Sequence, residues 1–104
     1  MKILALEKDV PGGSGRIPAR KLREEASRVW GLSQSGVIRE AYFQKDRPSA
    51  VLVLECRGAR EARRILSSLP LVSEGRIAFD VIPLVAYPGF ARLFSRKRRP
   101  GGED

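Results

Sequence analysis

Three short stretches of the chain carry apolar residues at nearly every position. They are residues 2–7, 50–55 and 76–84. Continuous apolar runs of this length are typical of strands that are covered on both faces. A fourth stretch, 37–44, alternates instead, with Val37, Arg39, Ala41 and Phe43 on one side and Ile38, Glu40, Tyr42 and Gln44 on the other. The pattern therefore predicts four strands, three of which need cover on both faces.

Two further stretches repeat their apolar residues every three or four positions, which is the spacing of one face of a helix. The first begins at Pro18, which suits a first helical turn, and ends near Gly36. Its apolar face consists of Leu22, Ala26, Val29, Trp30 and Ser33. We expect Trp30 to anchor the core, because an indole buries a large area. The second helix is predicted after Gly58, with an apolar face of Ala59, Ala62, Ile65, Leu66 and Leu69. Pro70 is expected to end it.

The remaining segments are expected to be connections. The glycine-rich run 8–17 lacks the lysine and hydroxyl residue that close a phosphate-binding Walker loop after its last glycine. It is predicted to be a plain connecting loop, with a lid over a site as the alternative. Residues 45–49 are predicted to turn the chain as a hairpin, and residues 73–75 to link the second helix to the last strand.

The order strand, helix, strand, strand, helix, strand predicts an α+β fold of the ferredoxin-like βαββαβ type. Its four strands form one antiparallel sheet with 2–7 and 50–55 in the centre, and both helices cover the same face. The other face would expose apolar side chains, and such a surface is expected to bind a partner. We therefore predict a homodimer with two sheets packed face to face, a dimeric α+β barrel. This domain covers residues 1–94, and residues 95–104 are predicted to be a disordered basic tail.

The net charge of +8 over 104 residues raises the question of nucleic acid. Residues 92–104 hold five Lys/Arg against two acids, so this end supplies +3 and the rest of the chain +5. A short basic run such as 96–99 is more often a solvated end than a nucleic-acid arm. RNA binding on the sheet would need aromatic residues on the central strands, which are aliphatic here. Nucleic acid is therefore kept only as a minor alternative.

Few residues of the chain are suited to metal binding. Cys56 is the single cysteine and there is no histidine, which excludes an internal disulfide and a cysteine-cluster zinc site. No cofactor is expected. No apolar run near the N-terminus is long enough for a signal peptide or a membrane span, so a cytoplasmic protein without a membrane contact is expected.

Several motifs resemble the muconolactone isomerase-like family of dimeric α+β barrels. The resemblance is carried by Leu-Ser-Ser-Leu-Pro-Leu at 66–71, by Asp-Val-Ile-Pro-Leu at 80–84 and by Tyr87 with Pro88. It extends to residues 1–6, 26–30 and 36–40 and covers most of residues 1–94. The resemblance implies the same fold, a homodimer or a larger ring, and transfer of a proton between two carbons of a lactone. The chain departs from the isomerases at Tyr87, where they have a histidine, and in the link between the second helix and the last strand.

A proton carrier in a chain without histidine has to be a carboxylate, a tyrosine or a lysine. The predicted catalytic residues are Asp80, Glu40 and Tyr42, which lie on apolar strands. Burial of Asp80 would raise the pKa of its carboxyl, as proton transfer requires. The alternative is structural: Asp80 pairs with Arg39 or Arg76 at a strand edge or a dimer seam. For Glu40 and Tyr42 the alternative is a solvent-facing edge strand.

Two functions of different classes follow. The first is binding or isomerisation of a small anionic lactone or organic acid, with Arg39 or Arg76 holding its carboxylate. Its pocket is expected between the sheet and the partner subunit, near Glu40, Tyr42 and Asp80, with the loop 11–15 at its entrance. The second is an oligomeric or regulatory module without catalysis.

Overall fold

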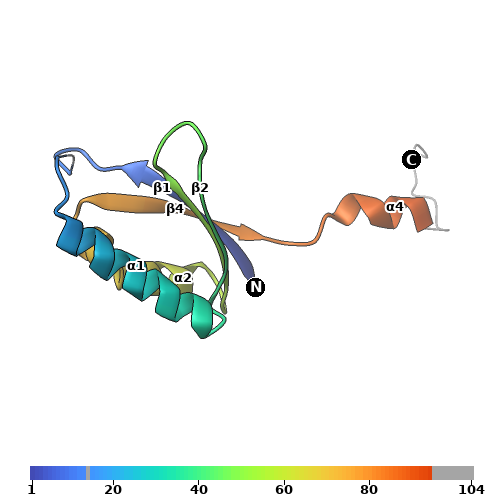
Figure 1. Ribbon diagram of the computed structural model, residues 1–104. Coiled ribbons are helices and arrows are strands. Elements are labelled where there is room, and N and C mark those ends of the chain that lie inside the picture. Colours follow the sequence, from blue (N-terminus) through green and yellow to red (C-terminus); the bar gives the residue numbers. More distant parts are fainter. Residues whose placement is uncertain (14, 95–104) are drawn as a thin grey trace.

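The computed structural model describes residues 1–13 and 15–94, and in them four strands form one antiparallel sheet beside several helices (Figure 1). The elements are β1 (Lys2–Asp9), α1 (Ala19–Gln34), β2 (Ile38–Phe43), β3 (Ala50–Glu55), α2 (Ala59–Ser67), α3 (Pro70–Ser73), β4 (Ile77–Leu84), η1 (Pro88–Phe90) and α4 (Ala91–Phe94). The predicted basic tail lies outside the described residues.

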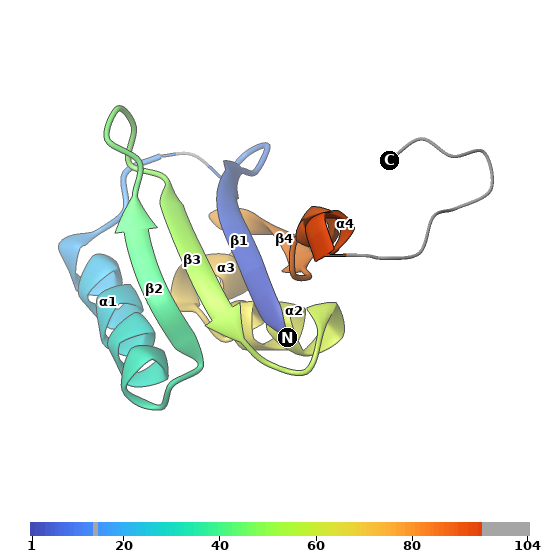
Figure 2. The same cartoon turned by 90° about the vertical axis from the view of Figure 1, so that its right-hand side faces the viewer.

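The strand order in the sheet is β2-β3-β1-β4, with β1 hydrogen-bonded to both β3 and β4. This confirms the predicted α+β fold, in which the first and third strands are central, and is consistent with the ferredoxin-like arrangement. Helices α1 and α2 lie on one face of the sheet, and Figure 2 looks onto the face that they leave open. β1 is longer than predicted by two residues, because Lys8 and Asp9 still pair with β4.

The core lies between the sheet and the helices. Ile3 on β1 and Leu54 on β3 are direct partners in the sheet, and neither has any exposed surface. The other buried apolar residues are Ala5, Leu32, Ile38, Leu52, Ala62, Leu66, Leu69 and Leu71. Each of the helices α1, α2 and α3 contributes at least one of them, so the amphipathic pattern of the sequence is what fastens this layer to the sheet.

The open face of the sheet carries the alternate residues of the same strands. Leu4 of β1 lies between Val53 of β3 and Ile82 of β4, and Leu6 lies beside Val51. In the single chain Leu4, Leu6, Val51 and Val53 are only partly buried, and Ile82 is exposed. The sequence predicted strands that are covered on both faces. In the single chain the helices cover only one of these faces.

A β-bulge in β2 overturns the predicted alternation of that strand. Ile38 pairs with Leu54 and Ala41 with Leu52, so three steps on β2 match two steps on β3. The extra residue at Arg39 leaves Ile38 on the helix side, where it is 3% exposed, together with Ala41. The prediction that Ile38 shares a face with Glu40 was wrong for this reason.

Pro70 ends one helix and begins another. Helix α2 stops at Ser67, and Pro70 is the first residue of α3, a position where its missing N–H is not needed. The predicted link 73–75 is therefore shorter than expected, with Ser73 closing α3 and Gly75 turning the chain at a φ of 74° into β4. Farther on, Pro83 is tolerated in β4 because this strand lies at the edge of the sheet.

Candidate ligand pocket

A pocket of about 730 Å³ lies between α1 and the helix side of the sheet. Its walls are mostly apolar. Helix α1 contributes Leu22, Ala26, Val29, Trp30 and Ser33, the sheet contributes Ala41, Phe43, Leu52 and Phe79, and Leu69 and Leu71 come from the segment around α3. Sites for small organic molecules commonly have this size and this apolar character.

The face of α1 that lines the pocket is the apolar face predicted from the sequence, but it does not pack tightly on the sheet. Ala26 on the helix and Ala41 on β2 are small and remain exposed. Trp30 is 67% exposed and Phe43 69% exposed, although both line the pocket. The prediction of Trp30 as a core anchor was therefore wrong, because Leu32 fills the core at this end of the helix and the indole stands at the pocket mouth.

Glu25 brings a half-buried carboxylate into the pocket wall. Its Oε1 accepts a hydrogen bond of 2.9 Å from the backbone N–H of Leu71 in the first turn of α3. Burial raises the pKa of the Glu25 carboxyl, the Leu71 N–H opposes this, and the nearby Glu7 carboxylate raises it further. A carboxyl with a raised pKa in an apolar pocket is suited to accept and return a proton.

Glu7 is a second carboxylate that lines the same pocket. It follows Ile3 and Ala5 at two-residue steps and so lies on the helix side of β1. Its Oε1 accepts a 2.8 Å hydrogen bond from the backbone N–H of Ala50, the first residue of β3. Each carboxylate is thus oriented by one backbone N–H.

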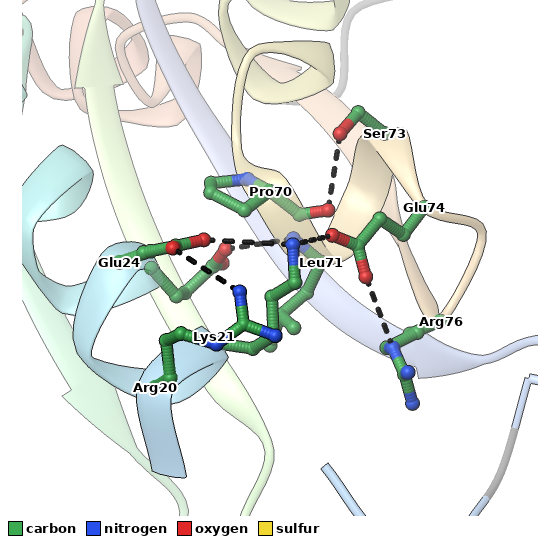
Figure 3. Close-up of polar contacts among 9 residues, drawn as sticks. Arg20, Lys21, Glu24, Pro70, Leu71, Ser73, Glu74 and Arg76 are labelled. Carbon is green, nitrogen blue, oxygen red and sulfur yellow. Dashed lines mark hydrogen bonds and ion pairs between the residues drawn. The ribbon is translucent and has the colours of Figure 1, made fainter. Parts of the chain in front are cut away.

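A network of charged side chains fastens the start of α1 to the turn before β4 (Figure 3). Glu74 pairs with Nζ of Lys21 and accepts a 3.2 Å hydrogen bond from Nε of Arg76. Both cations hold the pKa of the Glu74 carboxyl below its usual range. Contacts of this kind at the surface stabilise a fold only weakly, because water screens the charges. Their effect here is to set the position of α1 beside the pocket.

The two arginines predicted to hold a ligand carboxylate are placed elsewhere. Arg76 is engaged with Glu74, and Arg39 donates from Nε to the backbone oxygen of Gly36 at 2.6 Å. Neither residue lines the pocket. The structure brings no arginine among the described residues into the pocket wall.

The predicted catalytic residues lie on the open face of the sheet. Tyr42 donates a 2.8 Å hydrogen bond to the Glu40 carboxylate, which raises the pKa of the tyrosine hydroxyl. Asp80 is 57% exposed and pairs with Nζ of Lys8 at 2.9 Å, not with Arg39 or Arg76. Of the three, only Tyr42 borders the pocket. In the single chain Asp80 is therefore not buried among apolar side chains.

The sequence contained a signal for Glu25 that was missed. Glu25 lies three residues after Leu22 and four before Val29, in phase with the apolar face of α1. An acid at such a position faces the core side of the helix. No described residue of the glycine loop 11–15 lines this pocket.

The described residues contain neither a cluster of metal ligands nor a membrane-spanning helix. Residues 1–13 and 15–94 contain no group of three or more Cys, Asp or Glu side chains arranged to hold a metal ion. Within the same residues, no helix has the length and apolar content needed to cross a membrane.

Comparison with known proteins adds no relative from which a role could be taken. No protein-family model matches the chain, and no curated protein is significantly similar to it. The resemblance to the muconolactone isomerase-like family therefore rests on the motifs alone.

Proposed function

We propose that the protein is a cytoplasmic homodimer that binds a small, mainly apolar molecule between α1 and the sheet, and that Glu25 moves a proton on this molecule. The observation that carries the proposal is a half-buried carboxylate with a raised pKa in the wall of an apolar pocket of about 730 Å³. The motif resemblance makes a double-bond shift in a lactone the first reaction to test.

The pocket favours an uncharged ligand over an anion. Two carboxylates, Glu7 and Glu25, lie in its wall, and no arginine of the described chain lies there to offset them. A ligand carboxylate would be repelled, whereas a lactone ring would fit among the apolar side chains. The sequence predicted an anionic lactone or acid as the ligand, and the pocket favours the uncharged lactone among these.

The chemistry requires no net gain or loss of hydrogen. The ionised Glu25 carboxylate removes a proton from the γ carbon of an α,β-unsaturated lactone, which leaves a dienolate conjugated with the lactone carbonyl. The protonated carboxyl then returns the proton to a second carbon, and the double bond has moved. A raised pKa brings the acid and base forms of Glu25 closer to equal population near neutral pH, which is where such a shuttle works best.

The open face of the sheet supports the dimer. Its centre is formed by Leu4, Leu6, Val51 and Val53, and charged pairs such as Lys8 with Asp80 lie around it. An apolar centre with a polar rim is the usual composition of a protein interface. A second copy packed on this face would also cover Asp80, which keeps that residue as the alternative proton carrier.

Binding can be followed through the single tryptophan, because Trp30 lines the pocket. The neutral fluorescent probe N-phenyl-1-naphthylamine should quench Trp30 emission and itself gain fluorescence. Ala26→Phe fills the pocket and should abolish both signals. Ser27→Phe is the matched control, since Ser27 is the next residue on α1, is exposed and does not line the pocket. Equal probe binding by both variants would overturn the proposed pocket.

Catalysis is tested with muconolactone and its uncharged methyl ester. We expect the ester to bind more tightly, and Glu25→Gln to abolish turnover, because the amide keeps the hydrogen bond from Leu71 but cannot carry a proton. Asp80→Asn should leave turnover and its pH profile unmoved. If Asp80→Asn abolishes turnover and Glu25→Gln does not, Asp80 is the carrier. Probe binding without turnover of either compound would favour the module without catalysis.

A further inference from the structure

The ten residues that follow β4 form a structured segment with unusually apolar exposed side chains. In this C-terminal arm, residues 85–94, the exposed fractions are 82% for Val85, 65% for Tyr87, 64% for Phe90, 74% for Leu93 and 78% for Phe94. Figure 1 shows η1 and α4 projecting beyond the end of β4, away from the sheet and its helices. Single exposed apolar residues are ordinary on a protein surface, but five large ones within ten residues indicate a docking surface.

The arm has a local structure of its own, which distinguishes it from a solvated end. The rings of Tyr87 and Phe90 pack edge to face with centroids 4.9 Å apart. Gly89 makes this possible, because a Cβ atom at that position would collide with the Tyr87 ring. The apolar side chains are therefore presented in a defined shape, which lowers the entropy lost on docking.

The same molecule carries a second unpartnered apolar surface at the mouth of the pocket. Leu22, Trp30 and Phe43 line the pocket and are 49%, 67% and 69% exposed. They lie on α1 and on β2, the edge strand opposite β4. The arm leaves from β4, at the opposite edge of the sheet from β2 and α1 (Figure 2), so within one chain the two surfaces stay apart.

We propose that the C-terminal arm of one copy docks on the pocket mouth of a second copy, so that each binding site is closed by its partner. In a two-fold face-to-face dimer whose axis runs along the strands, β4 of one copy lies beside β2 of the other. The arm then continues from β4 toward the partner's α1 and β2. Residues 85–87 precede the helical turns of η1 and α4, so the arm spans roughly 20 Å, about the length of a six-residue strand. Because the two-fold axis relates the copies, each arm covers the pocket mouth of the other copy, and the same contact forms twice.

This inference rests on the proposed dimer and pocket, and it makes the partner arm part of the ligand site. Phe90 and Phe94 would supply aromatic cover over Trp30 in place of water. Water exclusion would favour the protonated form of Glu25 and hold an apolar ligand in place.

The test uses four proteins: the full chain, a chain truncated after Leu84, a chain truncated after Phe94 as the matched control, and the double variant Phe90→Ser with Phe94→Ser in the full chain. Dimerisation is measured by sedimentation, and cover over the pocket by acrylamide quenching of Trp30. We expect truncation after Leu84 and the double variant to raise the dimer dissociation constant at least about a hundredfold. That is the change for one large apolar side chain per copy that loses its burial, and both proteins lose at least two per copy. Quenching of Trp30 should rise in both. Truncation after Phe94 should change neither value.

Dilution separates a partner arm from an arm that folds back on its own chain. In the full chain Trp30 quenching should rise on dilution below the dimer dissociation constant. Quenching that does not depend on concentration, or that is unchanged by truncation after Leu84, would overturn the inference. The proposed function would survive that result if N-phenyl-1-naphthylamine still bound the full chain and not Ala26→Phe, so the two failures are distinguishable.

Discussion

The substitution Val53→Glu tests the face-to-face dimer most directly. Val53 lies on the open face of β3 between Leu4 and Glu40, whereas its neighbours Leu52 and Leu54 point into the core and are 3% and 0% exposed. A charge at position 53 therefore changes the proposed interface and leaves the core of the single chain intact. We expect a folded monomer.

The size of the effect follows from the two-fold symmetry. Loss of one buried valine side chain costs about 1.5 kcal/mol, and the dimer loses two, about 3 kcal/mol in all, which is about a hundredfold in the dissociation constant. Burial of an uncompensated carboxylate in the interface costs several kcal/mol more. The new charge also lies beside Glu40, which adds repulsion. The variant should thus be monomeric at micromolar concentration.

Sedimentation with circular dichroism measures assembly and folding together. Val81→Glu is the contrasting variant, because Val81 packs against the core on the helix side and a charge there should unfold the domain. Ser67→Glu, at an exposed position of α2, should alter neither property. A well-folded wild-type monomer at micromolar concentration, or a Val53→Glu protein that remains dimeric, would refute the reasoning.

Three further predictions concern stability. The raised pKa of Glu25 means that ionisation of this carboxyl costs the folded state free energy. The stabilising contribution of Glu25 is therefore present at low pH and is lost as the pH rises through the folded pKa. Urea unfolding should show Glu25→Gln gaining stability relative to wild type from about pH 4 to pH 7. Gly13→Ala should lower the melting temperature, because the new Cβ would lie 2.8 Å from the backbone oxygens of Gly75 and Arg76. Gly31→Ala, in open space on α1, should instead raise the free energy of unfolding by about 0.5–1 kcal/mol. Equal melting temperatures of the two variants would contradict both expectations. Truncation after Ser95 should leave the melting temperature nearly unchanged, since residues 96–104 contain no large apolar side chain; loss of a salt-sensitive affinity for DNA or RNA on truncation would restore the nucleic-acid hypothesis.

The fold could be predicted from the sequence because its pattern is local and repeated. Apolar runs, helical spacing and the residues Pro18, Gly36 and Gly58 gave the element order, and that order fixes the sheet topology. The bulge at Arg39 could not be predicted in this way. It depends on how β2 aligns with β3, and no residue of β2 marks the extra position by itself.

The candidate site was harder to predict because it depends on distances between elements. The predicted proton carriers are residues of strands, whereas Glu25 lies on α1, and its surroundings are created by α3 and by Glu7 from a distant strand. The space beside Trp30 likewise exists because α1 stands off from the sheet, which no periodicity in the helix reveals. The position of a residue in the helical or strand repeat indicates which face its side chain lies on. It does not indicate which other element packs against that face.

Both edge strands of the sheet carry an interruption, and this limits how the protein can assemble. The bulge at Arg39 distorts β2, and Pro83 removes a hydrogen-bond donor from β4. A further strand added at either edge would meet a broken ladder, so growth of the sheet from molecule to molecule into open-ended fibrils is disfavoured. Apolar strands of this kind are otherwise prone to such polymerisation. The chain can therefore keep an exposed apolar sheet face for the proposed dimer, while the edges of the sheet resist aggregation.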